Sequence, residues 1–131
     1  MASANSGTYR AFHARSIEDP EGFWAEQARL IDWHTPFTQV LDRSRPPFAK
    51  WYVCGTTNLC HNAVDRHLAQ RGGQPALIYV STETGVEHTY TYAELHREVN
   101  RIAAMLRALG AGRGDRVLIY MPMIPEAAFA M

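Results

Sequence analysis

The sequence has few cysteines, no excess of either charge and no long uninterrupted hydrophobic run. Cys54 and Cys60 are the only cysteines among 131 residues, too few for a disulfide framework and typical of a reducing compartment. The 13 basic residues balance 13 acidic ones, so charge gives no argument for binding nucleic acid or an acidic membrane surface. Proline and charged residues interrupt the longest apolar stretches, and the first residues lack the apolar segment of a secretory signal. We therefore expect a cytoplasmic protein without a membrane or nucleic-acid partner.

The composition nevertheless allows a folded core. Hydrophobic residues make up 47% of the chain and charged residues 20%, which excludes a wholly disordered protein. Residues 1–8 are small and polar, and we predict that they form a disordered leader.

The clearest helix pattern begins after Thr91. Thr91 and Glu94 form a T-x-x-E capping box, which predicts a helix starting at Tyr92. Apolar residues then recur at helical spacing and predict one buried stripe. The stripe consists of Leu95, Val99, Ile102, Ala103, Leu106 and Leu109.

A strand is expected soon after this helix. Gly110 can adopt the left-handed conformation that ends a helix, and residues 117–121 are apolar at consecutive positions. Such a run is typical of a strand covered on both faces, so strand, helix and strand together predict the start of a parallel α/β sheet. Pro125 and Glu126 then predict the start of another helix.

The first half of the chain gives weaker patterns. Asp19, Pro20 and Glu21 predict a helix from Pro20 to about Ile31. Three prolines among residues 32–50 argue against a long helix and predict an extended wrapping arm anchored by aromatic side chains.

Short regular elements are expected after the arm. Residues 51–53 have strand composition, and a helix is predicted over residues 59–70, with Thr57 or Asn58 as its cap. Residues 76–81 and 86–91 predict a β-hairpin.

Three small motifs invite a chemical interpretation, and in each case a structural interpretation is favoured. Gly55-Thr56-Thr57 lacks the spacing of a phosphate-binding loop and fits a helix cap. Cys54, Cys60 and His61 lack the paired spacing of a zinc site, so the thiols are expected to be buried as small apolar groups. Arg113-Gly114-Asp115 spells an integrin-binding motif but fits a turn between helix and strand.

Two further groups of residues leave alternatives open. His61, Asp65 and His67 could perform acid–base chemistry, but no nucleophile accompanies them and a helix-surface pair of His61 with Asp65 is favoured. An aromatic set could form a ligand surface, although packing against the body of a larger protein is favoured. This set comprises Trp24, Trp33, Phe37, Phe48 and Trp51.

Several stretches also resemble a known superfamily. The run TYTYAELHREVNRIAAMLRALGAGRGDRVLIYMPMIPEA resembles the opening segment of the adenylate-forming, AMP-binding enzymes. Upstream, FWAEQARLIDWHTPFTQVLD, FAKWYV and TNLCHNAVDRHL resemble the N-terminal region of short-chain acyl-CoA synthetases. These synthetases are the acetate and propionate ligases. In detail, the quoted stretches are most similar in sequence to the propionate–CoA ligases. The resemblance covers nearly all of the chain from Tyr9 onward.

The resemblance implies an incomplete α/β domain and an acid–thiol ligase as the parent enzyme. It divides the chain into the leader, residues 9–62 as the acetyl-CoA-synthetase-type region, and residues 63–131 as the start of the AMP-binding domain. A parent of this family would use ATP, Mg²⁺ and coenzyme A with a small carboxylic acid. Its phosphate loop and catalytic lysine lie in motifs that do not occur in this sequence. We therefore expect no catalytic, cofactor-binding or metal-binding residue here.

Two functional hypotheses follow. The chain is either the inactive N-terminal scaffold piece of a propionate–CoA or acetate–CoA ligase, whose partner is the remainder of that enzyme, or a stand-alone non-catalytic interaction module. Because the strand expected at residues 117–121 would lack cover, we also expect the isolated chain to form a homodimer.

Overall fold

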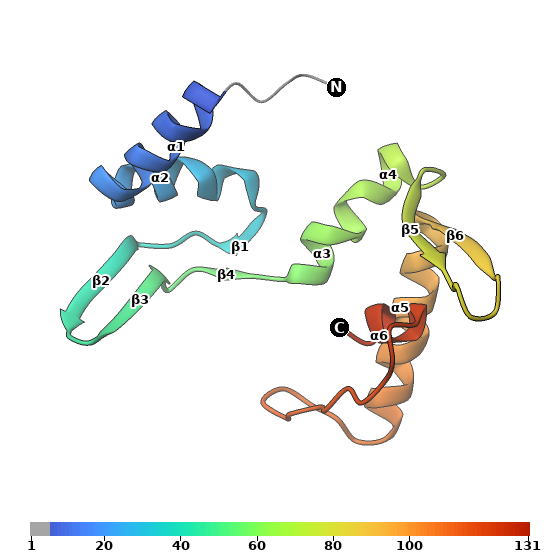
Figure 1. Ribbon diagram of the computed structural model, residues 1–131. Helices are drawn as coiled ribbons and strands as arrows, with labels where there is room; N and C mark the ends of the chain where they lie inside the picture. Colours follow the sequence, from blue (N-terminus) through green and yellow to red (C-terminus); the bar gives the residue numbers. More distant parts are fainter. Residues whose placement is uncertain (1–5) are drawn as a thin grey trace. The chain divides into compact units, whose positions relative to one another are not determined.

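The computed structural model describes residues 6–131, which form two compact units (Figure 1). The first unit ends at Leu59 and the second begins at Cys60. Each sheet among the described residues is a two-stranded antiparallel ribbon. The mixture of helices and small sheets agrees with the predicted α/β class, but the predicted parallel pairing is not formed within residues 6–131.

Two helices open the first unit, α1 (Ser6–Glu18) and α2 (Pro20–Gln27), and the 3-10 turn η1 (Ala28–Leu30) follows. The predicted start of α2 is confirmed, because the Asp19 carboxylate accepts a hydrogen bond from the backbone N–H of Gly22 at 3.0 Å. Helix α1 was not predicted, since its apolar residues do not gather on one face. It begins inside the predicted leader of residues 1–8, of which residues 1–5 lie outside the described part.

The predicted wrapping arm is a regular hairpin. Strands β2 (Gln39–Arg45) and β3 (Phe48–Val53) pair antiparallel, and residues 46–47 form the turn between them. Strand β1 (Trp33–Thr35) pairs with β4 (Thr56–Thr57). The extended conformation was predicted correctly but the irregular arm was wrong. The prolines lie between strands, where their missing N–H groups interrupt no ladder.

The core of the first unit is small and centred on α2. Phe23 is 1% exposed and Leu41 on β2 is 3% exposed. The ring of Phe12 meets Phe23 edge-on with centroids 4.7 Å apart, so α1 packs on α2 through an aromatic contact. The Tyr52 hydroxyl donates a hydrogen bond to the carbonyl of Trp24 at 3.1 Å, which joins the hairpin to α2.

The second unit begins with a broken helical segment. The predicted helix over residues 59–70 is divided into α3 (Leu59–Ala63), η2 (Asp65–His67) and α4 (Leu68–Arg71). The break falls at Val64, which is buried and has φ −126° and ψ −64°. Those dihedral angles are incompatible with a continuous α-helix.

The hairpin and the long helix that follow are confirmed. Strands β5 (Pro75–Val80) and β6 (Glu87–Thr91) pair antiparallel, and α5 (Tyr92–Ala108) begins directly after β6. The backbone N–H of Glu94 donates to the Thr91 hydroxyl oxygen at 3.2 Å, and the Thr91 N–H donates to the Glu94 carboxylate at 2.9 Å. The hydrogen bond from the Thr91 backbone has the largest effect on the pKa of Glu94, which it lowers, and the hydrogen bond with the Thr91 side chain lowers it further.

Helix α5 packs on β5, β6, α4 and α6 (Pro125–Phe129), yet no residue of α5 is fully buried. The predicted stripe is therefore only partly covered within this chain. Leu95, Val99, Ile102 and Leu106 are half-buried, whereas Ala103 and Leu109 are exposed. The predicted helix end is confirmed, because Gly110 has φ +92°.

The strand predicted at Val117–Met121 is not formed. These residues have no strand assignment, and Leu118 and Tyr120 are 88% and 96% exposed. A strand needs a hydrogen-bonded neighbour, and none of the described strands pairs with these residues. The predicted short helix does form as α6, with Pro125 in its first turn.

Within residues 6–131, no helix is both long and apolar enough to cross a bilayer.

We predict that Thr91→Ala lowers the free energy of unfolding of the second unit by about 1 kcal/mol, because it removes the hydroxyl that caps α5. Urea unfolding followed by circular dichroism at 222 nm measures this loss. Thr82→Ala is the matched control, since Thr82 is exposed in the loop between β5 and β6. Equal unfolding curves for the two variants would contradict the capping role.

Candidate functional site

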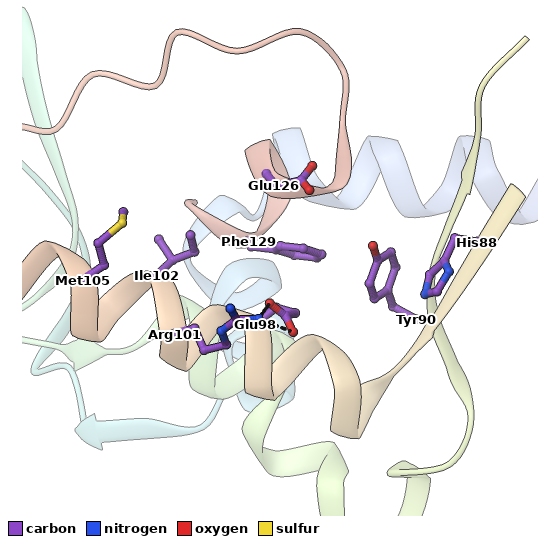
Figure 2. Close-up of a pocket in the computed structure, with 8 residues that line it drawn as sticks. All are labelled: His88, Tyr90, Glu98, Arg101, Ile102, Met105, Glu126 and Phe129. Atoms are coloured by element: carbon purple, nitrogen blue, oxygen red, sulfur yellow. Dashed lines mark hydrogen bonds and ion pairs between the residues drawn. The ribbon is translucent and has the colours of Figure 1, made fainter. Parts of the chain in front are cut away.

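A hollow of about 590 Å³ opens in the second unit between β6, α5 and α6 (Figure 2). Its lining combines aromatic, aliphatic and charged side chains. The lining residues are His88, Tyr90, Glu98, Arg101, Ile102, Met105, Glu126 and Phe129.

Aromatic rings form one side of the hollow. His88 and Tyr90 are two residues apart on β6, and the alternation of a strand places them on the same face. Their ring centroids are 4.2 Å apart, and Tyr90 meets Phe129 of α6 edge-on at 5.1 Å. Figure 2 shows Tyr90 between His88 and Phe129. Phe129 is 5% exposed, so this aromatic contact, together with packing on α5, holds α6 to the unit.

The charged side chains of the hollow differ in their partners. Arg101 donates hydrogen bonds to both carboxylate oxygens of Glu98, at 3.0 and 3.3 Å, along one turn of α5. The Glu126 carboxylate makes no hydrogen bond or ion pair with the residues that the structure describes. Burial raises the pKa of Tyr90, and the carboxylates of Glu126 and Glu98 raise it further. The hollow therefore favours an apolar group accompanied by positive charge.

The Gly-Thr-Thr motif has a structural role. Thr56 and Thr57 form β4, and the Thr57 hydroxyl donates to the carbonyl of Asp32 at 2.7 Å. A Cβ atom on Gly55 would lie 2.8 Å from the Trp33 ring, so the glycine is required for close packing. The motif is used within the first unit rather than as a phosphate loop.

The cysteines are both free thiols, and their surroundings differ from the prediction. Cys54 is exposed, so its expected burial was wrong, whereas Cys60 is half-buried. Burial and the nearby Asp65 carboxylate raise the pKa of Cys60, which makes its reactive thiolate scarcer. Within residues 6–131, no three His, Cys, Asp or Glu side chains are grouped so that they could hold a metal ion.

Asp65 has a partner that sequence spacing could not reveal. His96 Nε2 on α5 lies 3.7 Å from Asp65 Oδ1, so the contact joins two elements that are distant in sequence. The side chains of both residues remain more than a third exposed, and such surface pairs contribute little to stability. No nucleophile was found from the sequence to accompany them, and the pair gives no basis for assigning catalysis.

The Arg-Gly-Asp motif is part of a tight turn, as predicted. The backbone N–H of Gly112 donates to the Asp115 carboxylate at 2.7 Å, and Gly114 has φ +98°. The carboxylate is therefore engaged in the turn.

Four of the five residues in the predicted aromatic set belong to a network inside the first unit. Trp24 lies 6.1 Å from Trp51 and Trp33 lies 5.3 Å from Phe37, centroid to centroid. Phe48 is 78% exposed on the hairpin. Tyr52 also belongs to this network, although it was not in the predicted set, because its ring lies 5.1 Å from Phe37 and 5.3 Å from Trp33.

Comparison with known proteins identifies the family. Residues 9–63 match the model described as acetyl-coenzyme A synthetase N-terminus, and residues 64–131 match the model described as AMP-binding enzyme. The chain belongs to the AMP-binding enzyme family. The resemblance noted in the sequence is thus confirmed.

The chain is more similar in sequence to two propionate–CoA ligases than to an acetyl-coenzyme A synthetase. The chain is 60% identical to the propionate–CoA ligase of Salmonella typhimurium over 124 residues, which are 95% of this chain and 20% of that protein. It is 62% identical to the propionate–CoA ligase of Escherichia coli K12 over 120 residues, which are 92% of this chain and 19% of that protein. The chain is 47% identical to the acetyl-coenzyme A synthetase of Methylobacterium radiotolerans over 133 residues, which cover 99% of this chain and 20% of that protein.

The chain also matches the solved structure of an acyl-CoA synthetase. The acetoacetyl-CoA synthetase of Streptomyces lividans superposes with a TM-score of 0.82 at 39% identity, covering 98% of this chain and 20% of that protein. The chain thus spans about a fifth of the length of the relatives that it matches.

Proposed function

We propose that this chain is the N-terminal scaffold of an ATP-dependent propionate–CoA ligase. The observation that carries the proposal is the identity of 60% and 62% to two propionate–CoA ligases, against 47% to an acetyl-coenzyme A synthetase. An acetate-using ligase is the second candidate, because that lower identity still extends over 99% of the chain.

The proposed reaction joins propionate to coenzyme A in two steps. The propionate carboxylate displaces pyrophosphate from ATP to form an acyl-adenylate, and the coenzyme A thiol then displaces AMP to give propionyl-CoA. An anionic nucleophile must approach a polyphosphate, so Mg²⁺ and positively charged groups are needed where negative charge accumulates. The described residues do not fit these groups, because they contain no metal-ligand cluster and no glycine-rich lysine loop. We assign the chemistry to sequence outside this chain and no catalytic, cofactor-binding or metal-binding residue to the chain itself.

The scaffold role follows from the partial cover of the second unit. Helix α5 carries a predicted core stripe of which no residue is fully buried, and the apolar segment Val117–Met121 has no strand partner. We propose residues 9–62 as the acetyl-CoA-synthetase-type region and residues 63–131 as the start of the AMP-binding domain, in a cytoplasmic enzyme. The remainder of the ligase is then the partner that completes the sheet and covers the helix.

A chimera tests the proposed function. We expect a Salmonella propionate–CoA ligase in which this chain replaces the matching fifth to catalyse propionate-dependent ATP–pyrophosphate exchange, while the isolated chain catalyses none. Exchange by the isolated chain would overturn the assignment of the chemistry to other sequence. A soluble but inactive chimera would overturn the scaffold role, and faster exchange with acetate in a ligase carrying this chain's own continuation would favour the second candidate.

Self-association of the isolated chain is a separate prediction. Segment Val117–Met121 is apolar, has no strand assignment and is exposed except at Ile119, so two copies can cover these segments by pairing or exchanging them. Light scattering after size-exclusion chromatography should show a homodimer at high concentration. Leu118→Lys should shift the chain to monomer, whereas Thr82→Lys in an exposed loop should leave the dimer intact. A wild-type monomer at high concentration would contradict the prediction and, together with an inactive chimera, would favour a stand-alone interaction module.

A further inference from the structure

We propose that the hollow between β6, α5 and α6 is the docking site for a later segment of the ligase, one that inserts an apolar side chain and places a cation beside Glu126. The proposal rests on the proposed function, because the occupant is sequence that follows the matched region in the relatives. It assigns a specific interface within the whole enzyme.

The apolar side chains that line the hollow are unevenly covered. Phe129 at the base of the hollow is 5% exposed, Ile102 is half-buried, and Met105 is 51% exposed. The apolar lining of the hollow is therefore covered at Phe129 and open at Met105. A further apolar side chain seated over Met105 would bury the apolar surface that α6 leaves exposed beside Ile102.

The two carboxylates of the hollow differ in whether their charge is compensated. Glu98 is satisfied by Arg101, whereas Glu126 lacks a hydrogen bond or ion pair among the described residues. If a docking segment covered the hollow without neutralising Glu126, it would leave a carboxylate poorly solvated at the interface. A lysine or arginine on the occupant compensates for this charge.

The length of the relatives identifies the source of the occupant. The chain matches 19–20% of each propionate–CoA ligase, and the AMP-binding match continues to residue 131. About four-fifths of each ligase therefore lies outside the matched region and is available to cover α5. Inside this chain, α5 is already contacted by β5, β6, α4 and α6, and the hollow remains open beside them.

Cysteine labelling tests whether the hollow is covered. Met105→Cys places a thiol at the hollow, and Arg107→Cys places a control thiol two residues later, on another face of α5. Each variant is made in the isolated chain at low concentration and in the chimera, and maleimide modification is followed at the peptide level by mass spectrometry. We expect Cys at 105 to react at least about tenfold more slowly in the chimera, with little change at 107, because burial restricts access to local opening.

The outcomes separate the inference from the proposed function. Equal rates at position 105 in an active chimera would overturn the docking site while leaving the ligase assignment intact. Slow labelling at 105 in a folded chimera without propionate-dependent exchange would support the docking site and count against the ligase assignment. Concentration-dependent protection of position 105 in the isolated chain would identify a second copy as the occupant and overturn the proposal.

Reversing the charge of Glu126 tests whether the docking segment places a lysine or arginine beside it. Glu126→Lys should lower the thermal midpoint of the chimera more than that of the isolated chain, because only the chimera contains the proposed cation of the docking segment. Comparison of the two backgrounds removes the local effect of the substitution on α6. Glu83→Lys, in an exposed loop, is the control and should behave alike in both. If Glu126→Lys shifted the thermal midpoint equally in the chimera and in the isolated chain, the proposed cation beside Glu126 would be overturned.

Discussion

Phe23→Ala will unfold the first unit, with an expected loss of about 3–5 kcal/mol in the free energy of unfolding. Phe23 is 1% exposed and is the largest fully buried side chain among the described residues. Its ring contacts Phe12 of α1 and Trp24 of α2 edge-on, with centroids 4.7 and 5.1 Å away. Truncation leaves a cavity that the hairpin cannot fill, because the Tyr52 hydrogen bond to the Trp24 carbonyl fixes their spacing. In so small a core, this loss approaches the total stability of the unit.

Tryptophan fluorescence measures the effect selectively. All three tryptophans, Trp24, Trp33 and Trp51, lie in the first unit, so emission during urea unfolding reports on that unit alone. Phe48→Ala is the matched control, because Phe48 is 78% exposed and its truncation creates no cavity. If the two variants unfolded at the same urea concentration, Phe23 would not be the centre of the core.

Gly55→Ala is expected to cost about 1–3 kcal/mol, through overpacking rather than a cavity. The added Cβ would lie 2.8 Å from the Trp33 ring, 3.0 Å from the Tyr52 carbonyl oxygen and 3.1 Å from the Phe37 side chain. The backbone on either side has little freedom to yield. Tyr52 and Cys54 already have φ values of 51° and 63°, in a region where side chains are strained.

The sequence supplies a control for this substitution as well. A Cβ on Gly73 would have no heavy atom within 4 Å, so Gly73→Ala should change stability by only a few tenths of a kcal/mol. Fluorescence unfolding measures Gly55→Ala, and circular dichroism measures the control in the second unit. Stability unchanged by Gly55→Ala would show that the turn can move away from Trp33.

Local sequence patterns correctly predicted the elements that depend on interactions between residues close together in the sequence. The capping box of Thr91 and Glu94, the Asp19 cap and the left-handed Gly110 were all found correctly. Each depends on residues within a few positions of one another, so the side chains present are sufficient to determine the geometry. The β5–β6 hairpin was predicted for the same reason.

Patterns that depend on distant partners were predicted less well. Val117–Met121 has the composition of a buried strand but remains unpaired, because a strand forms only beside a neighbour. The prolines of residues 32–50 predict an irregular arm instead of the hairpin of β2 and β3, since the cross-strand pairing of Leu41 with Trp51 is not visible in the local sequence. The hollow was missed entirely, because its lining comes from β6, α5 and α6, and its exposure depends on which surfaces meet.

The sequence by itself determined the family, the helix caps and the position of the long amphipathic helix, because these depend on residue identity and short-range spacing. Only the tertiary structure decided that α5 remains half-covered, that Asp65 faces His96, and that Glu126, beside an aromatic hollow, has no hydrogen-bond or ion-pair partner among residues 6–131. These features depend on which surfaces pack together after the chain folds. Burial and long-range pairing are properties of the assembled chain, whereas a cap or a turn is already specified by a few neighbouring residues.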